Sequence, residues 1–147
     1  MNEINFYSRK DEYGWLSNFW RQVEKVDNKY YSTNEHYYQA CKSKDVEIFH
    51  WILSAPNPYL AMCAGRSLRK DKELINGWEK DKIKVMLKGL RAKFENLELR
   101  KRLLDTGDAI LHEDSPTDMF WGKYGKDMLG KLLMQVREEL KEEERLK

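Results

Sequence analysis

Two acidic residues, Glu35 and Asp118, stand in segments whose composition suits a reactive site better than a packed core. On a helix, Glu35 would share one polar face with Tyr38, Gln39 and Lys42, at positions i, i+3, i+4 and i+7. Asp118 follows a Ser-Pro turn and precedes two aromatic residues and a glycine. Two carboxylates on separate elements are the minimal equipment for cleaving a glycosidic bond through an oxocarbenium-like state.

Each carboxylate also has a purely structural interpretation. Ser32 to Glu35 has the pattern of a capping box, in which Glu35 at N3 would accept from the Ser32 backbone N–H. Asp118 in isolation is typical of a turn or cap residue. If Glu35 is functional, the helix macrodipole favours its ionised form, which suits a base, a nucleophile or a stabiliser of positive charge better than a general acid.

A glycine-rich segment from Gly122 to Gly130 leads into a helix and could bind an anion through exposed N–H groups. A helix cap with close helix packing explains the same glycines. Asp127 would repel a phosphate unless Arg66 or Lys126 offset its charge. The indole face of Trp121, beside Asp118, could hold a planar base or a ribose.

The histidines and cysteines lack the spacing of metal ligands. His36, His50 and His112 are scattered, and Cys41 and Cys63 form neither a disulfide framework nor a metal pattern. We therefore expect no metal and no cofactor, and we interpret both cysteines as buried thiols of a reduced protein.

The composition predicts one soluble domain spanning residues 1–147. Lys and Arg total 27 and Asp and Glu total 25, so the formal charge is +2, far from the basic excess typical of proteins that wrap nucleic acid. Small phosphorylated ligands need only two or three placed cations. No apolar run approaches ~18 residues, which predicts a cytoplasmic protein without a membrane partner.

The periodicity predicts a mainly α fold of the α+β class, a compact helical domain with a few short strands. Strands are expected at 4–7 and 109–113, and a small hairpin around Asp27-Asn28. Helices are expected after residue 33, over 46–53, up to Gly65, from near Trp78 to Phe94, over 97–104 and from Leu129 onward, with a charged helical tail at about 138–147.

An ordered set of short motifs across nearly the whole chain resembles the NADAR (YbiA-like) family. The set includes Leu16 to Phe19, Glu35 to Ala40 with Lys42, Gly65-Arg66, Trp78 to Met86, Lys93-Phe94, Asp118 with Trp121-Gly122, and Leu129-Gly130. The resemblance implies a mainly helical fold and N-glycosidase activity without a metal. It implies two substrate types: phosphoribosyl pyrimidine intermediates early in riboflavin synthesis, and ADP-ribose attached to guanine in nucleic acid.

Site residues follow from the resemblance position by position. Glu35 and Asp118 match the family's acidic motif residues and are assigned as catalytic. The residues assigned to substrate binding are Trp78, Trp121, Arg66, Gly65, Gly122, Lys126, Asn18 and Lys42.

Asp127 departs from the family, which usually has asparagine at this position, and this puts a polar contact to phosphate or ribose in doubt. Our first hypothesis is a hydrolase that cleaves base from phosphorylated ribose, such as an early riboflavin intermediate. The alternatives are removal of ADP-ribose from guanine in nucleic acid, and a module that binds ADP-ribose or a nucleotide without turnover.

Overall fold

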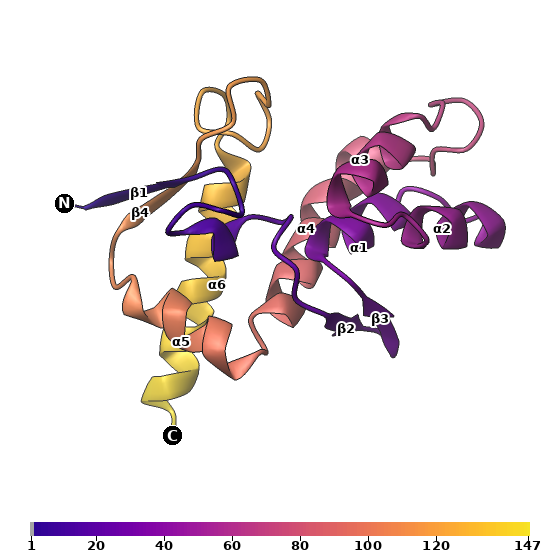
Figure 1. The fold of residues 1–147 in the computed structure, drawn as a ribbon. Helices are drawn as coiled ribbons and strands as arrows, with labels where there is room; N and C mark the ends of the chain where they lie inside the picture. The colour runs from indigo at the N-terminus through magenta and orange to yellow at the C-terminus, as the bar shows by residue number, and fades with distance from the viewer. Residues whose placement is uncertain (1) are drawn as a thin grey trace. The chain divides into compact units, whose positions relative to one another are not determined.

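A computed structural model describes residues 2–147, and the chain divides into two compact units. The first unit combines the two ends of the chain, up to Trp20 and from Phe94 onward. The second is continuous and spans Arg21–Lys93. Helices dominate both units, so the prediction of a mainly α fold with a few short strands is confirmed (Figure 1).

The first unit is built around a parallel pair of strands from opposite ends of the chain. β1 (Glu3–Phe6) pairs with β4 (Ile110–Glu113), with Glu3 opposite Ile110, and the two lie side by side in Figure 1. The remaining elements are the 3-10 helix η1 (Gly14–Leu16), α5 (Leu97–Asp105) and α6 (Met128–Arg145). The amphipathic α6 packs on β4 and α5, burying Leu129, Leu133 and Val136.

The second unit is organised around a short central helix. Its elements are α1 (Asn34–Ala40), α2 (Val46–Leu53), α3 (Pro58–Arg66), α4 (Trp78–Lys93), and the hairpin of β2 (Glu24–Val26) with β3 (Lys29–Tyr31). α1 packs against each of the three other helices and is buried along its whole length.

Two glycines let the neighbouring helices approach α1 closely. A Cβ on Gly89 of α4 would lie 2.3 Å from Asn34 Oδ1, and a Cβ on Gly65 of α3 would lie 1.9 Å from Gln39 Oε1. Because essentially no real Cβ contact is this short, both positions need glycine for packing. The side chains of α1 are therefore held between two backbones.

Local signals in the sequence set most element boundaries. Asn57 caps α3 by accepting from Leu60 N, with Pro58 in the first turn, and Asn96 caps α5 in the same way. Asp27 and Asn28 both have positive φ, as the tight hairpin requires. The predicted charged tail is helical to Arg145 and is anchored by Arg100, which pairs with Glu143 and Glu144.

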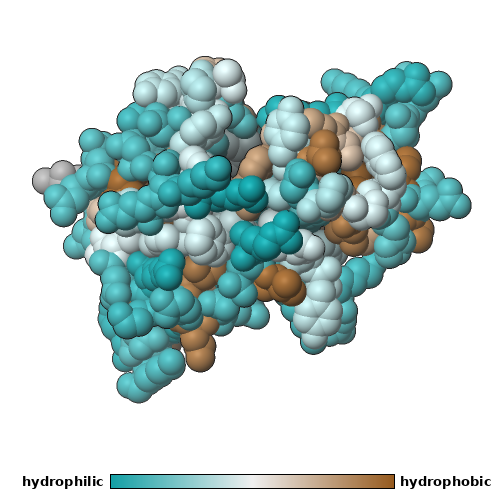
Figure 2. Space-filling view, in the orientation of Figure 1, coloured by the Kyte–Doolittle hydropathy of each residue, from teal (hydrophilic) through white to brown (hydrophobic). Residues whose placement is uncertain are grey.

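The visible surface in Figure 2 is mostly hydrophilic, and hydrophobic colour occurs in separate areas rather than one continuous patch. None of the helices in residues 2–147 combines the length and hydropathy that crossing a bilayer requires. The single-domain organisation stays a prediction.

Candidate functional site

Glu35 lies at the second position of α1, and the predicted capping box is wrong by one residue. The N-cap is Thr33, whose side chain accepts from the backbone N–H of His36 at 3.1 Å. The His36 ring also contacts Thr33 Oγ1 at 2.9 Å and the Ala55 carbonyl at 2.9 Å. His36 therefore occupies the N3 position that the sequence analysis gave to Glu35. The side-chain N-cap of α1 is Thr33, and Glu35 is at N2.

The Glu35 carboxylate is instead held by a side-chain amide one turn later. Gln39 Nε2 donates to Glu35 Oε2 at 2.7 Å, and the two residues are only 3% and 7% exposed. A hydrogen bond donated to a carboxylate favours its ionised form, whereas burial opposes ionisation. Gln39 lies on the predicted polar face of the helix but was not among the predicted site residues.

Lys42, Tyr38 and Trp78 lie near this pair, and the five residues together are called the Glu35 cluster below. Lys42 Nζ lies 5.9 Å from the centroid of Trp78 and 5.5 Å from that of Tyr38, and these two rings are 5.1 Å apart. Burial lowers the pKa of Lys42, while Glu35 acts to raise it and Arg66 acts to lower it. The predicted residues Glu35, Lys42 and Trp78 therefore converge around the solvent-shielded face of α1 that sequence periodicity indicated.

Gly65 and Arg66 end α3 next to this cluster. Gly65 is buried against the Gln39 side chain, so its contact is with a neighbouring helix, whereas Arg66 is exposed in the last turn. The structure thus gives Gly65 a packing role. Its predicted role in substrate binding stays a prediction.

Asp118 lies in the first unit, in a tight turn before Trp121. Its Oδ1 accepts from the backbone N–H groups of Phe120 at 3.0 Å and Trp121 at 2.9 Å. Ser115 Oγ in turn accepts from the Asp118 N–H at 3.1 Å. One carboxylate oxygen therefore has the turn-forming role that the alternative interpretation gave it. The indole of Trp121 is 9% exposed and packs edge-on to Phe120.

The glycine-rich segment packs closely against its own unit. A Cβ on Gly125 would lie 1.8 Å from the Met119 carbonyl oxygen, and a Cβ on Gly130 would lie 2.0 Å from that of Leu111. A Cβ on Gly122 would lie 2.5 Å from the Asp118 carbonyl oxygen, so this position is crowded as well. These contacts support the close-packing alternative for the glycines.

Asp127 precedes α6 but does not cap it through its side chain. It has φ 57°, in the left-handed region, and its side chain makes no cap hydrogen bond. The helix cap of the alternative interpretation is therefore not made by the Asp127 side chain. Asparagine and aspartate both tolerate this conformation better than other non-glycine residues, so either fits the backbone here.

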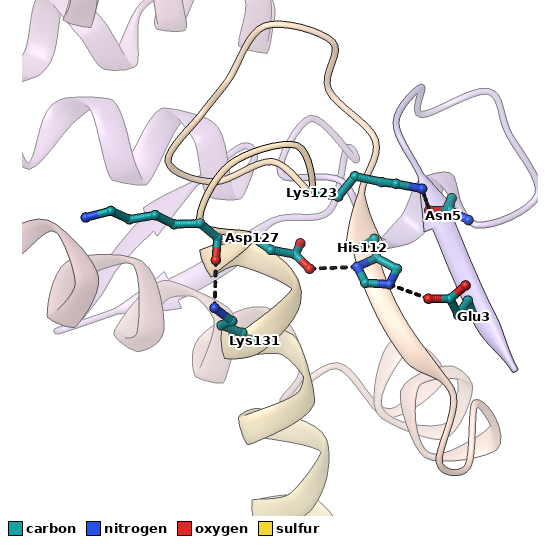
Figure 3. Close-up of polar contacts among 7 residues, drawn as sticks. Glu3, Asn5, His112, Lys123, Asp127 and Lys131 are labelled. Atoms are coloured by element: carbon teal, nitrogen blue, oxygen red, sulfur yellow. Dashed lines mark hydrogen bonds and ion pairs between the residues drawn. The ribbon is translucent and has the colours of Figure 1, made fainter. Parts of the chain in front are cut away.

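The Asp127 carboxylate faces His112 of β4 (Figure 3). His112 Nδ1 lies 2.6 Å from Asp127 Oδ2, and Nε2 lies 3.0 Å from Glu3 Oε1. Burial alone lowers the pKa of His112, but the hydrogen bonds to Asp127 and Glu3 outweigh it and raise the pKa overall. The charge that sequence analysis treated as a phosphate repellent is thus paired with an imidazole 15 residues away.

The other assigned residues of the first unit have varied surroundings. Asn18 is buried, and Lys126 is exposed with its Nζ 5.6 Å from the centroid of Phe120. Within residues 2–147, no group of three His, Cys, Asp or Glu side chains is arranged to hold a metal ion.

The cysteines differ from the prediction in one respect. Cys41 is half-buried, and burial raises the pKa of its thiol to about 11. Cys63 is exposed, because the buried side of α3 is the one that carries Ala61 and Gly65. The expected burial of Cys63 is therefore wrong.

The second unit also buries a charged pair that sequence analysis did not assign. Burial raises the pKa of Glu24 and lowers that of Lys93, and each opposite charge counteracts the shift of the other. The sequence signal for this burial was the helical spacing of Lys93 with Met86 and Leu90, which places all three on the buried face of α4.

A separate hollow of about 410 Å³ lies beside the hairpin of the second unit. Its lining includes Tyr37 and Cys41, which helical geometry places on the side of α1 away from Glu35. The hollow is therefore not part of the Glu35 cluster.

Comparisons with known proteins agree along most of the chain. The sequence profile of the NADAR domain matches residues 5–141. N-glycosidase YbiA of Escherichia coli K12 is 45% identical over 142 residues, covering 93% of this chain and 88% of that protein. An N-glycosidase of Nostoc punctiforme is 41% identical over 150 residues, covering 94% and 92%.

Two further comparisons concern the fold and a longer relative. The NMR structure of E. coli YbiA matches with a TM-score of 0.87 at 44% identity, covering 97% of this chain and 87% of that one. A riboflavin biosynthesis protein of Vibrio vulnificus is 36% identical over 144 residues, covering 95% of this chain but 39% of that protein.

Proposed function

The chain belongs to the NADAR family and is an N-glycosidase, and we propose that it hydrolyses the bond between a base and a phosphorylated ribose. The match to a protein named for riboflavin biosynthesis favours early intermediates of that synthesis as the substrate class. The observation that carries the proposal is the buried Glu35 carboxylate, which Gln39 holds in place.

The chemistry asked of Glu35 is to stabilise positive charge or activate water. As the bond between C1′ and the base nitrogen breaks, positive charge develops over C1′ and the ring oxygen of the sugar. An ionised carboxylate stabilises that charge or takes a proton from the attacking water. The water oxygen bonds to C1′, the bond electrons leave with the base, and a proton reaches the base nitrogen.

Asp118 is proposed as a second catalytic carboxylate. Because its Oδ1 already accepts two backbone N–H groups, the proposed role falls to Oδ2.

Substrate binding is proposed for residues of both units, several of them cationic or aromatic. Lys42 supports recognition of a phosphorylated sugar, since a shielded ammonium interacts more strongly with an anion than an exposed one. Arg66 supplies a second cation, and Trp78 an aromatic surface. The further proposed binding residues are Asn18, Gly65, Trp121, Gly122 and Lys126.

The formal charge of +2 favours a small phosphorylated substrate over a polynucleotide. Release of free base and ribose 5-phosphate would be assayed against a panel of phosphoribosyl pyrimidines and ADP-ribosylated guanine. We expect turnover of a phosphoribosyl pyrimidine by the parent and its loss in Glu35→Gln. Turnover of ADP-ribosylated guanine alone would show that this compound, and not a phosphoribosyl pyrimidine, is the substrate. Saturable binding without product would support a module that binds without turnover.

A further inference from the structure

We propose that Gln39 is the positioning residue for Glu35, and that position 65 is glycine to make room for the Gln39 amide. The inference rests on the proposed function for its catalytic meaning, but its geometry stands independently. In this proposal Gly65 acts on the site through Gln39.

The orientation of the Gln39 amide is fixed by the carboxylate. Nε2 donates to Glu35 Oε2 at 2.7 Å, whereas Gln39 Oε1 is buried without a hydrogen-bond partner among residues 2–147. Turning the amide over would bring Oε1 against the carboxylate, and two acceptors would then repel each other. The amide therefore keeps its Nε2 donor on Glu35. Its Oε1 acceptor stays unsatisfied, which is unfavourable for a buried oxygen.

Gly65 makes this arrangement sterically feasible. A Cβ at position 65 would lie 1.9 Å from Gln39 Oε1, 2.7 Å from Cδ and 2.9 Å from Cβ. The amide is therefore wedged between α3 and the carboxylate that it holds. Any side chain at position 65 would displace it from Glu35.

The arrangement has a chemical consequence for Glu35. A donor bonded to a carboxylate favours its ionised form and restricts its rotamers. An ionised, fixed carboxylate is the form that stabilises an oxocarbenium ion or accepts a proton from water. Lys42 favours the same ionised form, so the effect of Gln39 must be measured with Lys42 intact.

The first test follows the titration of Glu35 directly by carbon NMR of the side-chain carboxyls. The Glu35 signal is identified by its loss in Glu35→Gln. In Gln39→Met, which has a similar length and no donor, we expect the Glu35 midpoint to rise by about one pH unit. An unchanged midpoint overturns the proposal whether or not the protein shows glycosidase activity.

Gln135 provides a matched control on the surface. It donates to Glu139 at 3.3 Å, also four residues away on a helix, but this pair is exposed. Gln135→Met should leave both the Glu35 titration and turnover unchanged. If it shifts the Glu35 titration as much as Gln39→Met does, the effect is nonspecific and the assignment fails.

The activity readout separates this inference from the proposed function. With a phosphoribosyl substrate, Gln39→Met should lower kcat about tenfold with little change in KM, and should move the acidic limb of the pH profile to higher pH. If Glu35→Gln is inactive while Gln39→Met keeps the parental kcat and pH profile, the function stands and the positioning role falls. If Glu35→Gln keeps full turnover, the proposed catalytic role of Glu35 falls, while the NMR titration still decides whether Gln39 contacts Glu35.

A double-mutant cycle tests the role of Gly65. Gly65→Ala should raise the Glu35 midpoint in the parent by displacing the amide, but should add little to it in a Gln39→Ala background, where no amide remains. Additive shifts of the midpoint would show that Gly65 acts independently of Gln39. The melting temperature of each variant is also measured, because it distinguishes a general loss of packing from a specific effect on Glu35.

Discussion

The Glu35 cluster of the second unit and the Asp118 turn of the first present a carboxylate in opposite ways. Backbone N–H groups in its own turn bind Asp118 Oδ1, so that carboxylate stabilises a loop. Glu35 is bonded by the side chain of Gln39, while its helix is capped by Thr33. Because a neighbouring side chain rather than its own turn holds the Glu35 carboxylate, we expect Glu35 to contribute more to catalysis than Asp118.

The largest effect should come from Glu35→Gln. Losing the charge should reduce turnover by at least ~100-fold, the scale of a positioned base or charge-stabilising group. The melting temperature should hardly change, because Thr33 rather than Glu35 caps α1. Steady-state kinetics with thermal unfolding measures both, and Glu47→Gln, in the first turn of α2, is the exposed control. Near-parental turnover would remove Glu35 from the mechanism.

Asp118 calls for a pair of substitutions. Asp118→Asn keeps an Oδ1 acceptor for the two backbone N–H groups, so stability should be retained while turnover falls at least ~10-fold. Asp118→Ala should also lose about 1 kcal/mol of unfolding free energy, as for a lost cap. Full activity in the asparagine variant would leave Asp118 as a turn residue only.

The two lysines assigned to substrate binding should differ in effect. Lys42→Met should raise KM for a phosphorylated substrate by roughly tenfold, since its charge is shielded from water. Lys126→Met should have a smaller effect, because that side chain is exposed and screened. The measurement compares each KM with that for the dephosphorylated nucleoside, and equal effects would contradict the contrast between the two regions.

The smallest effect should be that of Asp127→Asn, and it should depend on pH. The pKa of His112 is raised in the folded state above its ordinary value of 6.5. The stabilisation is therefore complete below about pH 6.5, provided that the carboxylates are ionised, and is lost as pH rises through the folded pKa. Asparagine suits the left-handed backbone, so only the ion pair is removed.

Thermal unfolding between pH 5 and 9 checks this prediction. The variant should unfold roughly 3 °C below the parent at pH 6, as expected for about 1 kcal/mol, and the difference should shrink by pH 9. A difference in melting temperature that grows with pH would contradict the predicted stabilisation by protonated His112. Binding of a phosphorylated substrate should tighten by at most about twofold, because His112 already offsets the Asp127 charge.

The sequence by itself determined the elements whose signals lie within one helical turn. The predicted helix over 46–53 is the observed span of α2, and the hairpin predicted around Asp27-Asn28 is present, because caps and turn residues act on neighbouring backbone. The ordered motifs likewise identified the family.

Tertiary structure decided the contacts between residues that are distant along the chain. It also decided which of two adjacent hydroxyl residues caps a helix. Thr33 rather than Ser32 caps α1, with His36 anchored on Ala55. Gly65 was predicted at a site, but only helix packing shows that it faces Gln39.

The first unit shows the same limit over a longer range. The parallel strand pairing of Glu3 with Ile110 and the side-chain contact of His112 with Asp127 depend on tertiary packing, which no local pattern encodes. Helical periodicity gave the face on which Glu35 lies. Which atoms bind its carboxylate depended on the backbone packed against that face.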